Sequence, residues 1–184
     1  MGVTGILGGR FDPPHVGHLA LATTAVEHFG IDDLHVTVVV DAAHKRAEAP
    51  IEHRLAMARL GFASLDAVVE PEEHRYTVDA LEACRYDDPI FLIGADQLAD
   101  FPTWKDPERV LELARLGVAA RPGHAAPVEN SDRIDIFELE PQDVSSTAIR
   151  ERVRSGARID GLVVPEVADY IARHGLYVRL PRLH

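Results

Sequence analysis

VTGILG at residues 3–8 passes directly into GRFDPPHVGHL at residues 9–19, near the start of this 184-residue chain. The first segment is short, apolar and closed by glycine, which predicts a buried β-strand. The second carries Gly, Pro, Asp and His up to residue 17 and is predicted to be a loop. From His18, apolar residues recur at helical spacing until Gly30 ends the pattern, which predicts a helix. The chain therefore begins with a strand, a loop and a helix.

Short apolar strands and amphipathic helices alternate along the rest of the chain. Strands are predicted at 34–40, 67–69, 90–94, 116–120 and 134–139, and helices at 51–64, 77–85, 107–114, 145–155 and 165–174. This alternation predicts an α/β fold of the Rossmann-like type, a mainly parallel sheet with helices on both faces. The length suits one core, so we expect a single domain over 1–184 whose C-terminal helical part starts at about residue 145.

The composition narrows the class of protein. The chain has 30 acidic and 19 basic residues and a net charge of −11, which argues against binding to nucleic acid or to anionic membranes. No apolar run approaches the roughly 18 residues that a membrane-spanning helix needs. No signal peptide is recognised at the N-terminus. The single cysteine, Cys84, allows no internal disulfide and fits a reducing compartment, so we expect a cytoplasmic protein.

The loop after the first strand has the chemistry of a polyphosphate site. Gly8 and Gly9 allow close approach of the backbone and expose N–H donors, and the next helix directs free N–H groups to the same place. His15 and His18 are three residues apart, so both can face one side and donate to phosphate oxygens. A plain turn with two incidental histidines is one alternative, and metal binding is another. Zinc is not expected, because no further His or Cys pair lies at ligand spacing.

The order Gly-Gly-x-Phe-Asp-Pro-Pro-His-x-Gly-His-Leu at residues 8–19 resembles the signature of nucleotidyltransferases with the HxGH motif. More narrowly, it resembles the bacterial nicotinate-nucleotide adenylyltransferases. Similar family elements recur at 75–81 (RYTVDAL, where Arg75 and Ala80 depart from the pattern), 93–97 (IGADQ), 144–150 (VSSTAIR) and 161–177, so the resemblance covers almost the whole chain. It implies transfer of the adenylyl group of ATP to nicotinate mononucleotide, which gives deamido-NAD and pyrophosphate in NAD biosynthesis.

The resemblance also implies roles for individual residues. The implied catalytic residues are His15, His18, Lys45 and Arg150. The implied ATP-binding residues are Gly8, Gly9, Arg10, Phe11, Gly94, Asp96, Ser146 and Thr147. The implied residues for the mononucleotide are Thr77, Trp104 and Arg121. Mg²⁺ is expected to bind mainly through the ATP phosphates, without an assigned protein ligand.

Plain structural roles stay open for several of these residues. The alternatives are helix capping for Thr77, for Asp96 and for Ser145 or Ser146, core packing for Trp104, and a solvated surface position for Lys45 and Arg121.

One position departs from the family and leaves the acceptor open. Arg10 stands where bacterial members usually carry Thr or Ser, and a Gly-Arg-Phe start resembles the archaeal branch that uses nicotinamide mononucleotide. The same chemistry on nicotinamide mononucleotide, phosphopantetheine or a phosphorylated alcohol is therefore an alternative. A non-catalytic nucleotide-binding protein and a metal hydrolase are more distant ones. The oligomeric state does not follow from the sequence.

Overall fold

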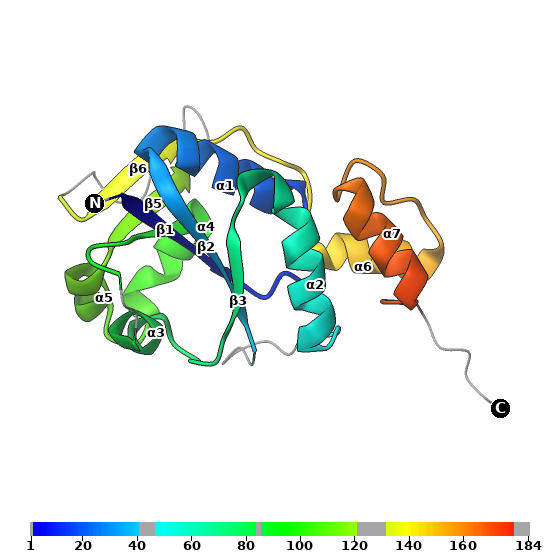
Figure 1. Cartoon of the computed structure of the whole chain (residues 1–184), viewed down its shortest axis with the longest axis horizontal. Coiled ribbons are helices and arrows are strands. Elements are labelled where there is room, and N and C mark those ends of the chain that lie inside the picture. Colours follow the sequence, from blue (N-terminus) through cyan, green and yellow to red (C-terminus); the bar gives the residue numbers. More distant parts are fainter. Residues whose placement is uncertain (1, 41–46, 84–85, 121–131, 179–184) are drawn as a thin grey trace.

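The computed structural model describes residues 2–40, 47–83, 86–120 and 132–178 (Figure 1). Its centre is a six-stranded sheet in the order β3-β2-β1-β4-β5-β6, and every strand pairing in that sheet is parallel. The strands are β1 (Val3–Gly9), β2 (Ile31–Val39), β3 (Val68–Glu72), β4 (Ile90–Gly94), β5 (Arg115–Ala120) and β6 (Ile134–Glu138). The predicted parallel α/β sheet is therefore confirmed.

Helices cover both faces of the sheet. They are α1 (Val16–Phe29), α2 (Ile51–Gly61), α3 (Thr77–Ala83), α4 (Ala95–Asp100), α5 (Pro107–Leu113), α6 (Ser146–Ser155) and α7 (Pro165–His174), with short 3₁₀ turns at Ala63–Leu65 and Phe101–Thr103. Alternate strand residues divide between two apolar clusters. Leu7 and Val36 pack towards α1 and α2, and Ile6 and Phe91 pack towards α3, α4 and α5. None of the described helices has the length and apolar character to span a membrane.

The strand order reverses beside β1. The chain moves outward from β1 to β2 and β3, and then returns to place β4 on the other side of β1. In an open parallel sheet this reversal leaves a crevice beyond the carboxyl ends of the strands, where ligands usually bind. The fold therefore places the loop after β1, which carries both histidines, at the crevice.

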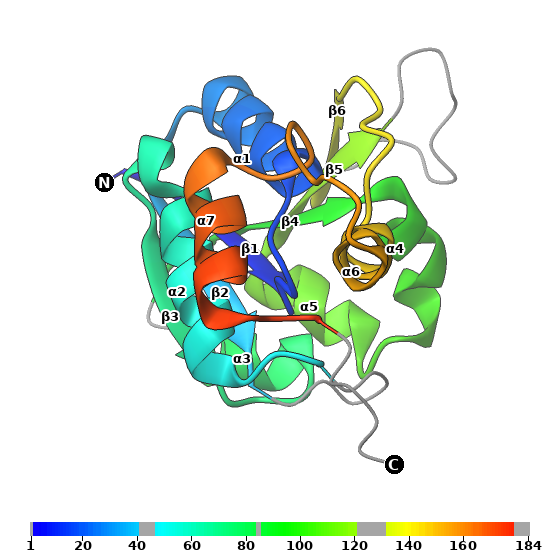
Figure 2. The same ribbon diagram turned by 90° about the vertical axis from the view of Figure 1, so that its right-hand side faces the viewer.

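The helices α6 and α7 form a third layer beyond those carboxyl ends. Figure 1 shows them at the end of the sheet towards which β1 runs, and in Figure 2 they lie in front of the strands. Ile149 of α6 and Val167 and Ile171 of α7 share an apolar cluster with Met57 of α2. This cluster joins the C-terminal helices to the sheet domain.

Several element boundaries differ from those predicted. α1 begins at Val16 rather than His18, because His15 takes the extended N-cap conformation. β3 extends through Pro71 to Glu72, which an edge strand tolerates. The helix α4, which was not predicted, follows β4 without a loop. β2 begins at Ile31, three residues early, because Ile31 pairs with Val3 of β1.

Candidate active site

The two histidines after β1 lie against each other. Their rings stack with centroids 3.7 Å apart and planes 22° apart, and the His15 backbone N–H donates to His18 Nδ1 at 3.2 Å. Because Nδ1 of His18 accepts a hydrogen bond, the proton of a neutral ring is on Nε2. The expected placement of both imidazoles on one side is therefore present.

Burial keeps both imidazoles neutral. Loss of solvent lowers the pKa of His15 to about 4. Loss of solvent, together with the neighbouring His15, lowers the pKa of His18 to about 3. Nδ1 of His15 is buried and has no partner among the described residues. At neutral pH the pair can therefore donate hydrogen bonds from N–H groups without the cost of a buried positive charge.

A tight turn places the ring of Phe11 against the ring of His18. Phe11 has a φ of 47°, is 2% exposed, and meets the edges of His18 and Phe62 at centroid distances of 5.1 and 5.4 Å. A Cβ on Gly9 would lie 3.0 Å from this ring, so any other residue there would require the ring to shift. The Phe11 side chain is thus a packing group, and only its backbone is available to a ligand.

Asp12 is the buried anchor of the same loop. Its carboxylate is 1% exposed and accepts hydrogen bonds from the backbone N–H of Glu48 at 2.7 Å and of Ala49 at 3.1 Å. The hydroxyl of Tyr177 also donates to it at 2.7 Å. Burial raises the pKa of that tyrosine, and the charge of Asp12 adds to the effect. Asp12 therefore ties the loop to segments far away in the sequence.

The start of α6 contacts this loop directly. Ser146 Oγ donates to the carbonyl of Pro13 at 2.8 Å, and the guanidinium of Arg150 donates to the carbonyl of Asp12 at 2.8 Å. Arg150 is 8% exposed, and it also donates to Glu48 at 2.8 Å and to Thr147 Oγ1 at 3.2 Å. Both ends of the chain thus meet at one place, as the sequence predicts.

Glu48 pairs with a second guanidinium as well, that of Arg154. Burial pushes the pKa of Glu48 up, but hydrogen bonds from Arg154 and Arg150 outweigh this effect, so its pKa is lowered. The guanidinium of Arg150, which was expected to bind the phosphates of ATP, is therefore paired with a carboxylate of the same chain, that of Glu48.

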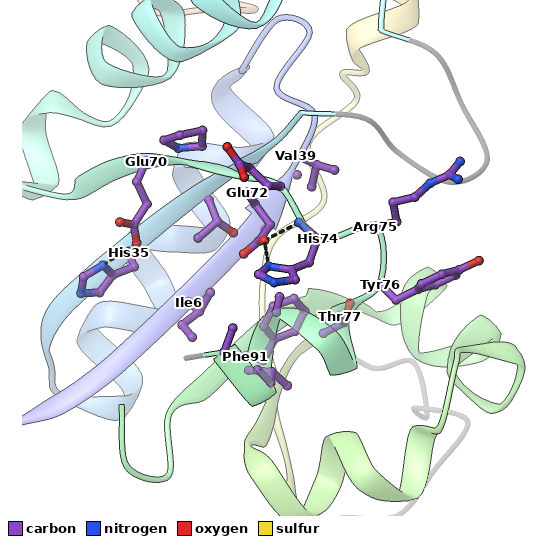
Figure 3. A pocket seen from close by; sticks show the side chains of 18 of the residues that line it. Ile6, His35, Val39, Glu70, Glu72, His74, Arg75, Tyr76, Thr77 and Phe91 are labelled. Carbon is purple, nitrogen blue, oxygen red and sulfur yellow. Dashed lines mark hydrogen bonds and ion pairs between the residues drawn. The ribbon is translucent and has the colours of Figure 1, made fainter. Parts of the chain in front are cut away.

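A cavity of about 760 Å³ opens beside the loop (Figure 3). Gly8, Gly9 and Arg10 line one side, and Thr77 and Trp104 line another. The Trp104 ring is partly buried and meets Phe101 and Phe91 edge-on at centroid distances of 5.3 and 6.3 Å. Trp104 therefore packs against the core, as the structural alternative predicts, and also borders the cavity, while its contact with the mononucleotide stays a prediction.

The cavity is also lined by polar side chains of two neighbouring strands, β2 and β3. His35 and Thr37 of β2 and Glu70 and Glu72 of β3 line it. Nδ1 of His35 lies 3.3 Å from a Glu70 oxygen and 3.0 Å from the hydroxyl of Tyr86. Parallel sheets are normally apolar on both faces, so this polar stripe marks the surface as a binding region.

Comparison with known proteins agrees with this geometry. A family model described as cytidylyltransferase-like matches residues 6–152, which include the end of β1, the loop and the start of α6. The chain belongs to this family.

Its relatives have closely similar lengths. A Gemmatimonas aurantiaca protein named "Probable nicotinate-nucleotide adenylyltransferase" is 38% identical, and the match covers 97% of this chain and 93% of that protein. A Bordetella pertussis protein of the same name is 39% identical, with 96% of this chain and 100% of that protein covered. The solved structure of the Plasmodium falciparum nicotinic acid mononucleotide adenylyltransferase complexed with NaAD has a TM-score of 0.77 at 18% identity, and the match covers 96% of this chain and 98% of that one. The last match shows a shared fold.

The remaining predicted site residues of this cytidylyltransferase-like protein lie at helix starts or outside the described residues. Gly94 ends β4 and is the N-cap of α4, so the capping role considered for Asp96 is wrong; Asp96 is exposed in the first turn of α4. Thr77 is the first residue of α3. Ser145, not Ser146, caps α6, because its hydroxyl accepts from Ala148 N–H at 3.1 Å. Lys45, Arg121 and Cys84 lie outside the described residues.

Sequence reasoning missed the buried polar residues of this cytidylyltransferase-like protein. The buried ones are Asp12, Arg54 and Tyr177. The exposed Glu48 was missed as well, as was the stripe of His35, Thr37, Glu70 and Glu72. The stripe had a detectable signal, since polar and apolar residues alternate along 35–38, a pattern typical of a strand with one polar face. No three His, Cys, Asp or Glu side chains gather into a metal site within the described ranges.

Proposed function

We propose that this protein transfers the adenylyl group of ATP to nicotinate mononucleotide and releases pyrophosphate, as a step of NAD biosynthesis. The observation that carries the proposal is the contact between the histidine loop after β1 and the start of α6, beside a cavity bordered by Trp104. The full-length relatives with the corresponding names support the same reaction and acceptor. A cytoplasmic location is part of the proposal.

The reaction needs no covalent intermediate on the protein. A phosphate oxygen of the mononucleotide attacks the α-phosphorus of ATP, the new P–O bond forms, and the bond between the α-phosphorus and the bridging oxygen to the β-phosphate breaks. Pyrophosphate takes the electron pair of that bond. The attacking phosphate is already ionised, so no general base is required. Catalysis then consists of alignment and stabilisation of negative charge.

The residues around the loop suit those two tasks. The N–H groups near Gly8 and Gly9 and the start of α1 would face the phosphates, and His18 would donate from Nε2 to a phosphate oxygen. Arg10, Gly94, Asp96, Ser146 and Thr147 are the further ATP contacts proposed from the family resemblance. Lys45 and Arg150 are the proposed cations, and Arg150 would have to exchange Glu48 for a phosphate.

Mg²⁺ fits this site as a companion of ATP. When bound, it would supply positive charge against the phosphates. The carboxylate of Asp12 already accepts three hydrogen bonds, and the described residues hold no cluster of metal ligands. The phosphates and water would therefore be its main ligands.

An acceptor panel tests the proposal. Purified protein, Mg²⁺ and ATP are mixed in turn with nicotinate mononucleotide, nicotinamide mononucleotide and phosphopantetheine, and pyrophosphate release is measured. We expect the largest kcat/KM with nicotinate mononucleotide. A larger value with the amide would reassign the acceptor, as Arg10 suggests. ATP binding without pyrophosphate release for any acceptor would support a non-catalytic nucleotide-binding protein instead.

Substitution of Trp104 tests whether the cavity is the binding site of the mononucleotide. The Trp104→Ala variant should raise the KM for the mononucleotide about tenfold, because a stacking surface is lost, and change the KM for ATP far less. Trp104→Phe should restore most of the affinity. Equal effects on both substrates would mean that Trp104 is only a core residue.

A further inference from the structure

Arg54 is a buried cation that the reaction described above does not use. It lies on α2, is 2% exposed, and donates four hydrogen bonds. All four go to backbone carbonyls: Ala49 at 3.0 Å, Arg10 at 3.0 Å, Val39 at 2.7 Å and Val40 at 3.0 Å. The side chain thus bridges the end of β1, the end of β2 and the segment that leads into α2.

This arrangement is costly for stability alone. Burial lowers the pKa of Arg54, and the charge of Asp12 only partly opposes that effect. No carboxylate is among its four hydrogen-bond partners. A well-packed apolar side chain of similar volume often gives equal or greater stability at such a position. The presence of a guanidinium here therefore points to a role beyond packing.

The bonded carbonyls lie at the place where phosphates are expected. Arg10 directly follows Gly9, the last paired residue of β1, and Val39 is the last paired residue of β2, so both lie at the carboxyl edge of the sheet. Carbonyl oxygens carry partial negative charge, and unpaired ones at this edge would oppose a polyphosphate. The cation of Arg54 offsets that charge.

The same bonds fix the geometry of the loop. The carbonyl of Arg10 immediately precedes Phe11, whose positive φ turns the chain towards His15 and His18. Arg54 holds that carbonyl at a set distance from the end of β2, which leads into the segment before Glu48 and Ala49.

We infer that Arg54 is a positioning residue for adenylyl transfer: it clamps the ends of β1 and β2 so that the histidine loop is shaped, and electrostatically prepared, for the triphosphate of ATP. The inference rests on the function proposed above.

Substitutions at two arginines of α2 test this inference. Arg54→Met removes the charge and the hydrogen bonds, and Arg54→Lys keeps the charge but not the fork that reaches four carbonyls. Arg59→Met is the matched control, since Arg59 is exposed on the same helix. Each variant is first checked by circular dichroism and thermal unfolding. The KM for ATP, the KM for the mononucleotide and kcat are then measured.

We expect Arg54→Met to raise the KM for ATP roughly tenfold or more and to lower kcat, with the mononucleotide KM within about twofold of wild type. Arg54→Lys should recover most of the ATP affinity but not kcat. A third variant, Arg54→Ala, leaves space for a guanidinium ion and is checked for folding in the same way. Millimolar guanidinium ion should restore part of its turnover and leave that of Arg59→Met unchanged. A purely structural role would not produce this division between the two substrates.

Three results would overturn the inference. These are an unchanged KM for ATP in a folded Arg54→Met protein, equal losses for both substrates, or failure of both Arg54→Met and Arg54→Lys to fold, which would assign Arg54 to stability. Failure of the proposed function is recognised separately, because wild type would then release no pyrophosphate. The dissociation constant of a non-hydrolysable ATP analogue would still report on Arg54 in that case.

Discussion

The imidazole of His18 is both neutral and fixed in orientation. Its Nδ1 is occupied by the backbone N–H of His15, so its proton is held on Nε2, and burial keeps the ring neutral. A neutral donor of fixed orientation can approach a phosphate without first losing a proton or turning. His15 stacks on it and limits its movement.

Removal of His18 should therefore impair the chemical step more than binding. We expect His18→Ala to lower kcat by about 10²-fold or more with little change in thermal stability at pH 7.5. The measurement is steady-state pyrophosphate release, and His28→Ala, an exposed histidine on the same helix, is the control. Near-normal turnover of His18→Ala would exclude this residue from the chemistry.

The same histidines should make the fold sensitive to acid. Their pKa values are lowered from 6.5 to about 4 and about 3, so below pH 6.5 the unfolded chain takes up protons that the native state refuses. Stability is thus complete above pH 6.5 and is lost as the pH falls towards 4, by up to about 1.4 kcal/mol per pH unit for each histidine.

Urea unfolding at several pH values between 5 and 7.5 measures this slope. The double variant His15→Gln/His18→Gln lacks both titrating groups and should show a clearly shallower dependence than wild type. Identical slopes would mean that other histidines cause the acid sensitivity.

The limits of sequence interpretation differ among these residues. The proximity of His15 and His18 follows from a three-residue spacing at a helix start. Their stacking and their low pKa values do not, because both depend on tertiary packing. One such contact is that of His18 with Phe11, whose positive φ no sequence pattern predicts. Arg54 and Asp12 were missed for a related reason, since polar residues are usually exposed and only tertiary contacts show them to be buried.

At the level of elements, the meeting of the β1–α1 loop with the start of α6 was predictable, because both segments carry chemistry suited to one anion. The partner of Arg150 was not predictable. Glu48 reaches it across 102 positions from a segment without helical or strand periodicity. The helix α4 was missed because its six residues directly follow a strand, and so short a segment gives little periodic signal.

Glu48 should compete with ATP for the guanidinium groups of α6. Glu48→Gln removes the charge but keeps the backbone N–H that donates to Asp12. Arg150 and Arg154 would then lack their carboxylate, so we expect the KM for ATP to fall about threefold to tenfold and inhibition by pyrophosphate to strengthen.

Steady-state kinetics at constant ionic strength measures this effect. Glu52→Gln is a suitable control, because Glu52 is exposed in the first turn of α2. A higher KM for ATP together with a lower melting temperature would show that the pair of Glu48 and Arg150 is structural.

For the whole molecule, the alternation of strands and helices was sufficient to predict a parallel sheet, but not the order of its strands. That order depends on which crossover connections pass to which side of β1, and periodicity carries no such information. The third layer is held to the sheet by an apolar cluster and by the hydroxyl of Tyr177, which reaches Asp12. Tyr177 has a φ of 64°, a conformation that a non-glycine residue keeps only when its surroundings hold it.

Loss of that hydroxyl should weaken the whole fold. Tyr177→Phe leaves the Asp12 carboxylate with its two backbone donors, so we expect the free energy of unfolding to fall by about 1–2 kcal/mol, with reduced turnover because the loop is less fixed. Urea unfolding and pyrophosphate release measure the two effects. Tyr170→Phe, which removes a partly buried bond to His53, should cost less. Equal losses in the free energy of unfolding would mean that the hydrogen bond to Asp12 stabilises the fold no more than the one to His53.

The bond between Tyr177 and Asp12 spans 165 positions of the chain. On the ribosome, the histidine loop is made well before Tyr177, so this partner does not exist until Tyr177 has been added and has left the exit tunnel. A nascent chain therefore contains every glycine and histidine of the loop before the hydrogen bond from Tyr177 to Asp12 can form. A premature stop a few codons before 177 would leave the sheet and the motif intact and still deprive the loop of this support.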